Sequence, residues 1–551
     1  MKTPSSGPER QGLHLAMMAA LALISLALSW HWMSRISADD PWYRNTDMNI
    51  HNIADALCLN SGYAPGTVSQ PGATSRYLLA LDFRLRNEFG LLPTWTLKRF
   101  ARSPDPLPAL AQLVHVGREH SRLLVMFFLL VGAAFIRTVT GRLDLACLAI
   151  ALLGGSAGLL FHGLLLRPEL LCAGFGLLSS YGAWLATTDS RPAGRIVWLL
   201  LAGIFAGLAL LSMLLGFLYL LSAVAWLLIA PRRPTLTSPG EPAQRGTADW
   251  IRCLCLASAL AMVGLLILIG DQPDLLHPKG TARLRLLVLF VALAPLMHWV
   301  RTDRPLPRYL IDRSLDLALL SSGILVAFLG WYGLLLFVMP TDQAAIYMAK
   351  ILSSLCYPDT WLELYTRPGL VHRWLQFRLF ILDAPQLFLL GASFVLGLAF
   401  LPRLAARWRA LLILLLIQAI AFAFVLSQHQ FLDQYSIFTQ VPLLLLWPIG
   451  LAALSGQPAA QGGGALLGWP AALATTAAFI ISLTVTFQLG PKYRNFQDDR
   501  DLPVRELTIT FLYDHAEHPP AYLNAMKQRY PTRADFRVAL DRYLEGSTPR
   551  R

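Results

Sequence analysis

Long apolar stretches separated by short polar ones run along most of this chain. Thirteen stretches approach the length of about 20 residues that a helix needs to cross a hydrocarbon core of roughly 30 Å. They lie near residues 13–33, 122–140, 143–161, 169–187, 195–212, 214–230, 253–270, 284–300, 315–338, 379–401, 409–427, 437–455 and 467–489. The run 195–230 is too long for one helix rising about 1.5 Å per residue, so we divide it into two spans.

Composition agrees with this pattern. The chain has 551 residues, of which 55% are hydrophobic and 14% charged, and its mean hydropathy is +0.50. Soluble domains carry about 25% charged residues. The fold class we predict is therefore an all-α polytopic membrane protein with about 13 transmembrane helices. The net charge of +13 comes largely from arginines beside the spans, which indicates topology and lipid headgroups, and no nucleic-acid partner.

Lysine and arginine concentrate in every second loop, and this bias sets the orientation. It places the N-terminus in the cytoplasm and, with an odd number of spans, the C-terminus outside. The first span lacks a small-residue cleavage site and is typical of a retained signal anchor. We expect a multi-pass protein of the bacterial cytoplasmic (inner) membrane, with its C-terminus periplasmic or extracellular.

Most non-membrane residues then lie on the outer side. They form a first loop, 34–121, a late loop, 339–378, and a C-terminal segment, 491–551, which follows a transmembrane domain, 1–490. The C-terminal segment contains two short predicted helices, 521–530 and 534–546, and is small for a core of its own. We expect it to pack on the outer face as a structural cap, where it covers the site or contacts the acceptor.

The first loop begins with a helical pattern. From Asp47, the apolar positions Ile50, Ile53, Ala54 and Leu57 recur at helical spacing until Gly62. Turns rich in Pro and Gly follow, and a second amphipathic helix is predicted over 74–89. We expect both helices to lie along the membrane surface. Because ionisable residues within the spans are few, chemistry is expected at that surface, and an ion-coupled transporter is disfavoured.

A signal anchor, an Asp, a leucine-containing helix, a Gly and a Pro-containing turn follow one another in this order. This order resembles the first outer loop of GT-C-type integral membrane glycosyltransferases, most closely the protein-mannosyltransferase and aminoarabinose-transferase group. The stretch HGLLLRPELL, 162–171, resembles a short outer turn common in them. The resemblance places Asp47 at the Asp of that group's Asp-Glu pair. Met48 replaces the Glu, and Gln70–Pro71 stands loosely at its His-Pro turn.

The resemblance implies inverting transfer of a sugar from a polyprenyl-phosphate-linked donor to an extracytoplasmic acceptor, which is a glycan, lipid or protein. Such transfer needs a carboxylate that takes the acceptor's proton and cations that hold the departing phosphate. Asp47 is the first candidate for the base, with helix capping as the simpler role. Asp39 and Asp40 are alternatives. Glu169 is a candidate second carboxylate or a structural partner of Arg167.

Two outer patches are candidates for binding the donor phosphate or sugar. Aromatic and basic residues alternate in the late loop, and a polar patch follows a later span. The candidates are Arg367, His372, Arg373, Arg378, His429, Gln434 and Tyr435. The simpler roles are an interfacial helix that touches lipid headgroups and a polar hairpin.

Three questions stay open at this stage. Cys58 and Cys356 fall outside the membrane, where a disulfide between the two loops is chemically permitted. Some members of the broader fold use a divalent metal, but Asp39, Asp40 and Asp47 are too loosely spaced to predict one. The rival functions are a lipid or glycolipid transporter and a non-enzymatic membrane scaffold. The sugar, the acceptor and the carrier length are not defined by these motifs.

Overall fold

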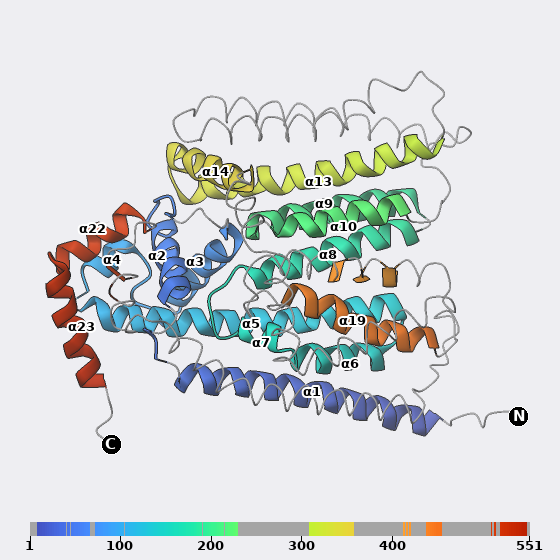
Figure 1. The fold of residues 1–551 in the computed structure, drawn as a ribbon, viewed down its shortest axis with the longest axis horizontal. Helices are drawn as coiled ribbons and strands as arrows, with labels where there is room; N and C mark the ends of the chain where they lie inside the picture. Colours follow the sequence, from blue (N-terminus) through green and yellow to red (C-terminus); the bar gives the residue numbers. More distant parts are fainter. Residues whose placement is uncertain are drawn as a thin grey trace, which may run out of the picture.

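The computed structural model describes residues 8–39, 41–43, 46–66, 72–103, 105–189, 191–213, 215–229, 308–356, 411–413, 415–416, 418–419, 437–454, 509, 512–513 and 518–547. Within these ranges the chain is helical and contains no β-strand. The long helices lie roughly parallel in a bundle, and short helices gather at one end (Figure 1). The all-α class predicted from hydropathy is therefore confirmed for the described part of the chain.

Five described helices are long and apolar enough to cross a membrane. They contain the spans Leu15–Ser37, Pro106–Thr140, Glu169–Thr188, Pro192–Ser212 and Leu315–Val338, in helices α1, α5, α8, α9 and α13. Helices α6, Leu143–Gly154, α10, Gly216–Ile229, and α19, Ile437–Leu454, are shorter. The predicted spans 253–270, 284–300, 379–401 and 467–489 lie outside the described residues, so the total of thirteen remains a prediction.

Two long helices extend beyond the spans predicted for them. Helix α1 runs over Pro8–Asp39 and α5 over Pro106–Thr140. The start of α5 is fixed by Asp105, whose carboxylate accepts a hydrogen bond of 3.1 Å from the Leu107 N–H, and by Pro106 at the first helical position. Polar residues thus continue both helices past their apolar parts into the predicted first loop, whose bounds 34–121 remain a prediction.

The predicted span 143–161 is also not one helix. Helix α6 ends at Gly154, and a separate turn of helix, α7, covers Ala157–Phe161. Between them Ser156 donates a hydrogen bond of 2.5 Å to Gln440 Oε1 of α19, which also accepts one of 3.0 Å from the Gly158 N–H. The glutamine thus satisfies backbone and side-chain groups that the break in the helix leaves unpaired.

The division of the run 195–230 is confirmed. Helix α9 covers Pro192–Ser212, and α10 begins at Gly216. Helix α13, Arg308–Val338, packs on α9 through small residues. A Cβ added at Gly203 would lie 2.0 Å from the Leu320 carbonyl oxygen, and one at Gly207 would lie 2.7 Å from Ala327 Cβ. Only glycine at Gly203 allows the two backbones to approach this closely.

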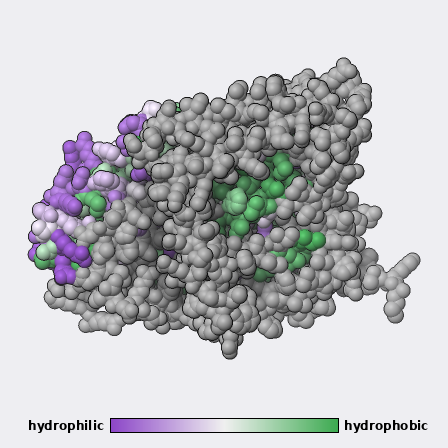
Figure 2. Space-filling view, turned by 45° about the horizontal axis from the view of Figure 1, so that its top comes forward, coloured by the Kyte–Doolittle hydropathy of each residue, from purple (hydrophilic) through white to green (hydrophobic). Residues whose placement is uncertain are grey.

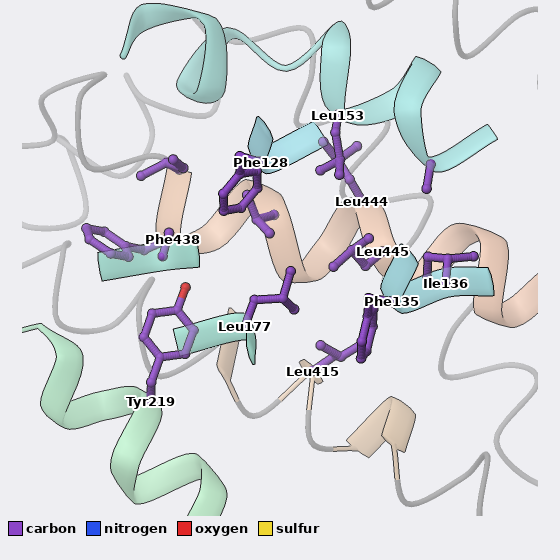
Figure 3. Packing of buried hydrophobic residues seen from close by; sticks show 14 of the residues in the cluster. Phe128, Phe135, Ile136, Leu153, Leu177, Tyr219, Leu415, Phe438, Leu444 and Leu445 are labelled. Atoms are coloured by element: carbon purple, nitrogen blue, oxygen red, sulfur yellow. The ribbon is translucent and has the colours of Figure 1, made fainter. Parts of the chain in front are cut away.

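The bundle is held by a core of buried apolar side chains from α5, α6, α8, α10 and α19. Phe128 and Phe135 of α5, Leu177 of α8, Tyr219 of α10 and Phe438 of α19 all belong to this core (Figure 3). A second core lies at the end of the molecule, where hydrophilic surface also gathers (Figure 2). It joins helices of the first loop to the C-terminal segment and to α14, Thr341–Cys356.

The loop helices and the C-terminal helices are present where the sequence predicts them. The first loop forms α2, Thr46–Leu59, α3, Ala73–Glu88, and α4, Leu97–Ala101. The C-terminal segment forms α22, Pro520–Arg529, and α23, Arg533–Ser547. Aromatic contacts bind the two segments, with ring centroids 5.8 Å apart for Phe100 and Tyr522 and 5.9 Å apart for Trp42 and Tyr543. The C-terminal segment therefore packs on the first loop, while the boundary at 491 remains a prediction.

Candidate functional site

Helix α2 lies at the centre of the candidate site, and its polar face is buried. Asn49, His51, Asn52 and Asp55 are each at most 6% exposed, like the apolar stripe on the other side of the helix. The helix is therefore enclosed by protein on its polar side as well, and its orientation along the membrane surface remains a prediction. Buried polar groups are unfavourable unless they are hydrogen-bonded, so each of these side chains should hold a particular partner.

Two of these side chains clamp a single peptide group. Asn52 Nδ2 donates a hydrogen bond of 2.8 Å to the Leu166 carbonyl oxygen, and the Leu166 N–H donates one of 3.1 Å to Asn49 Oδ1. Asn49 and Asn52 are three residues apart and therefore lie on one side of the helix. Leu166 belongs to the turn that leads into α8, so the clamp fixes this turn against the first loop.

A buried ion pair joins α2 to α3. Arg76 Nε lies 2.9 Å from Asp55 Oδ2, and their side chains are 5% and 0% exposed. The other oxygen, Asp55 Oδ1, accepts a hydrogen bond of 2.9 Å from the Gly66 N–H. Arg76 Nε also lies 3.4 Å from Asn52 Oδ1, so the ion pair and the clamp are continuous. The charged groups are thus paired with each other and with polar neighbours instead of water.

Two neutral groups complete this cluster. Tyr347 of α14 is 1% exposed, and burial raises its pKa to about 12, against the opposing charge of Arg76. Cys58, one turn beyond Asp55, is a free and fully buried thiol. Burial, with the negative charge of Asp55, raises the pKa of Cys58 well above its usual value. Because Cys58 is a free thiol, the disulfide to Cys356 that the sequence left open is not formed.

At the start of α8, Arg167 and Glu169 form a second buried pair. Arg167 Nη1 donates a hydrogen bond of 3.0 Å to Glu169 Oε1, and the side chains are 7% and 0% exposed. The second oxygen, Glu169 Oε2, is buried and accepts no hydrogen bond from the described residues. A buried carboxylate oxygen without a partner is uncommon and needs an explanation, of which a role in binding or catalysis is one.

Of the site residues predicted from the sequence, the structure describes the side chain of Glu169 but not those of the others. Glu169 lies in the site, on the same turn as the clamp. Asp47 is the second residue of α2, and Asp39 is the last residue of α1. The side chains of Asp39 and Asp47, and the whole of Asp40, lie outside the described residues. So do the seven donor-binding candidates, Arg367, His372, Arg373, Arg378, His429, Gln434 and Tyr435.

Sequence reasoning missed the clamp and the ion pair. Asn49, Asn52 and Asp55 recur every three residues, which is the one sign in the sequence that this face also meets protein. Arg76 carried no local signal, since it lies four residues after Gly72 on an otherwise ordinary helix. In the described part of the chain, His, Cys, Asp and Glu form no group of three or more that could hold a metal ion.

No protein-family model and no curated protein matches the chain. Among solved structures, it is similar to the archaeal oligosaccharyltransferase AglB from Archaeoglobus fulgidus, in complex with an inhibitory peptide and a dolichol-phosphate. The TM-score is 0.46 and the identity 16%, over 92% of this chain and 59% of that one. The apo form of the Archaeoglobus fulgidus oligosaccharyltransferase gives a TM-score of 0.44 and 14% identity, over 91% and 59% of the two chains.

Both neighbours are oligosaccharyltransferases. This chain spans 59% of the length of either neighbour. Their activity, substrates and partners are therefore proposals for this chain, to be argued from its own residues.

Proposed function

We propose that this protein is an inverting membrane glycosyltransferase. It would move a sugar from a polyprenyl-phosphate-linked donor in the bilayer to a hydroxyl or amine of an extracytoplasmic glycan, lipid or protein. The acceptor oxygen or nitrogen forms a bond to the anomeric carbon, while the bond from that carbon to the phosphate oxygen breaks. Asp47 takes the acceptor's proton, and polyprenyl phosphate leaves.

The observation that carries this proposal is the clamp between α2 and the turn before α8. Asp47 lies two residues before Asn49, and Glu169 lies three residues after Leu166. The hydrogen bonds of Asn49 and Asn52 to Leu166, 3.1 and 2.8 Å long, therefore hold two acidic segments at one junction. Transfer from a lipid-linked donor requires carboxylates near the end of a membrane bundle, because the donor's phosphate lies there.

Glu169 fits the role of a second carboxylate in this scheme. Arg167 holds one of its oxygens at 3.0 Å and leaves the other without a hydrogen bond from the described residues. A carboxylate fixed in this way can accept a hydrogen bond from a sugar or acceptor hydroxyl without reorganising, which is how preorganised polar groups favour a transition state. Arg167 in turn brings positive charge to the segment where a phosphate would depart.

The experiment follows release of polyprenyl phosphate by the purified full-length protein. Donors are a panel of polyprenyl-phosphate sugars, and membrane extract supplies acceptors. We expect release to fall about a hundredfold or more in Asp47→Asn, because a general base contributes roughly 10²–10⁴-fold. Asp342→Asn is the matched control, since Asp342 is an exposed carboxylate at the start of α14. The anomeric configuration of the product tests inversion.

Each outcome decides between specific alternatives. Equal release by wild type and Asp47→Asn would contradict the assigned base and direct attention to Asp39→Asn and Asp40→Asn. A loss of release in Glu169→Gln, with unchanged thermal unfolding, would support the second carboxylate. No release by any protein over a broad panel would overturn the glycosyltransferase proposal in favour of a lipid transporter or a scaffold.

A further inference from the structure

A groove of about 520 Å³ lies between the end of α1 and the first half of α5, separate from the clamp and the ion pairs. Both helices are polar here, although both belong to apolar spans further along. The polar side chains that line the groove are Ser34 and Ser37 of α1 and Gln112, His115, Glu119 and Arg122 of α5. This groove has no role in the proposed reaction.

Arg122 lies one turn after Glu119 on α5 and is attracted by its charge, but no hydrogen bond or ion pair joins Arg122 to an acid within the described part of the chain. Its guanidinium carbon lies 5.6 Å from the centroid of the Trp30 ring. Its Nε is buried and has no hydrogen-bond partner among the described residues. A guanidinium held over an aromatic ring keeps its N–H groups available in its own plane, which suits a planar approach to phosphate oxygens.

The other charges around the groove are already paired. Glu119 accepts a hydrogen bond of 2.9 Å from Arg86 Nη1, and Arg86 also pairs with Asp82 at 3.1 Å. Behind the groove, the buried Arg118 donates to the carbonyl oxygens of Ser37 at 3.4 Å and Pro41 at 3.2 Å. Because Glu119 is already paired with Arg86, the positive charge of Arg122 favours an anionic group in the groove.

The groove continues into apolar surface on both helices. On α1, Leu23 is 66% exposed and lies eleven residues, or about three turns, before Ser34. On α5, Leu123 and Phe127 are 50% and 63% exposed and follow Glu119 at spacings of four residues, along the same side of the helix. Exposed apolar stripes on membrane-spanning helices face acyl chains. A ligand in the groove therefore has its polar part between polar side chains and its apolar part in the bilayer.

We propose that this groove binds a glycerophospholipid of the surrounding bilayer through its phosphate. Arg122 contacts the phosphate oxygens, the hydroxyls of Ser34 and Ser37 and the amide of Gln112 donate hydrogen bonds, and the acyl chains follow the apolar stripes. In this proposal Trp30, which holds the Arg122 guanidinium, takes the place near the headgroups that interfacial tryptophans prefer. The bound lipid would fill the gap between α1 and α5 next to the first loop.

Native mass spectrometry of the full-length protein in detergent tests this proposal. The probe is phosphatidylglycerol, and the comparison lipid is diacylglycerol with identical acyl chains, which lacks phosphate. We expect wild type to bind phosphatidylglycerol at least tenfold more tightly than diacylglycerol. Arg122→Gln removes the charge, and Ser34→Leu fills the groove without changing charge. Both should reduce phosphatidylglycerol affinity at least tenfold, while Arg84→Gln, on an exposed arginine of α3, should leave it unchanged.

Three results would overturn the proposal. One is unchanged phosphatidylglycerol affinity in both groove variants. Another is equal binding of diacylglycerol, because the groove would then recognise acyl chains alone. The third is binding of polyprenyl phosphate with no binding of phosphatidylglycerol, because the occupant would then be the donor's carrier. Thermal unfolding in lipid-free detergent verifies that the variants are folded, and none of these outcomes depends on glycosyltransferase activity.

Discussion

Replacing Asp55 by Asn tests whether the buried ion pair holds the first loop together. The change removes the charge that Arg76 Nε meets at 2.9 Å, where both side chains are at most 5% exposed. An uncompensated charge then remains in a buried site, which destabilises proteins by about 3–5 kcal/mol. The asparagine oxygen can still accept from the Gly66 N–H, so the loss is confined to the ion pair. We expect α2 and α3 to open more often without any change in the bundle.

Cys58 supplies the assay, because it is fully buried on the next turn of α2. In a variant whose other five cysteines are replaced, the rate of maleimide labelling at Cys58 reports how often this helix becomes exposed. Since about 1.4 kcal/mol corresponds to a factor of ten, the expected destabilisation predicts labelling faster by roughly a hundredfold to a few thousandfold. Labelling occurs in the open state, so the raised pKa of the native thiol does not affect this ratio.

A partly exposed ion pair serves as the control. Arg86 Nε lies 3.1 Å from Asp82 Oδ1, and the side chains of Asp82 and Arg86 are 19% and 18% exposed. Exposed ion pairs of this kind contribute about 0.2–1 kcal/mol to the free energy of unfolding. Asp82→Asn should therefore accelerate Cys58 labelling by less than about fivefold. If Asp55→Asn labels within threefold of wild type, the ion pair does not hold α2, and the account of this loop is wrong. Partial recovery in Asp55→Leu with Arg76→Met would support the electrostatic explanation.

Three further predictions follow from the described contacts. Asp316→Asn should lower the thermal unfolding temperature in detergent. The reason is that Arg195 Nη2 contacts both oxygens of the buried Asp316 carboxylate, at 2.6 and 2.5 Å, and the variant removes this negative charge. An unchanged unfolding temperature would contradict this prediction. Gly203→Leu should separate α9 from α13 and reduce the yield of folded protein, because a Cβ at position 203 would lie 2.0 Å from the Leu320 carbonyl oxygen. A normal yield of folded protein would show that the two helices can move apart. Burial alone would raise the pKa of Asp82, but His120 and then Arg86 lower this pKa below its ordinary value. The ionised Asp82 should therefore contribute its full stabilisation above a pH of about 4, the ordinary pKa of an aspartate. This contribution should be lost as the pH falls through the lowered pKa of the folded protein. Comparing wild-type and Asp82→Asn unfolding between pH 3 and 6 measures this, and parallel curves would refute it.

Much of the fold was predictable because hydropathy and turn residues act locally. Gly62, at φ 78°, follows the last residues of α2 as predicted, and the 195–230 run divides at the expected place. The errors have physical causes. Polar residues can continue a membrane helix into the loop, as they do before Leu123 in α5, and a short break such as that after Gly154 is invisible to an average over many apolar residues.

The candidate site was less accessible to sequence reasoning. Glu169 was identified because it stands beside Arg167 in a polar turn between two apolar stretches. The partners of α2 were not, because they come from segments far apart in the chain: Leu166 lies 114 residues from Asn52 and is bound only through its peptide group. A backbone partner leaves no mark on residue type, so no motif could have indicated it.

The burial of α2 on every side changes the interpretation of the whole first loop. A helix that only lay on the membrane would need one apolar face, and its polar residues could vary freely. Here the polar face is engaged as fully as the apolar one, since Asn49 and Asn52 hold the turn at Leu166 and Asp55 holds α3 through Arg76. Such a helix cannot shift or rotate without breaking several buried hydrogen bonds at once. The first loop is therefore a rigid support, and that rigidity is what a catalytic carboxylate at Asp47 would require.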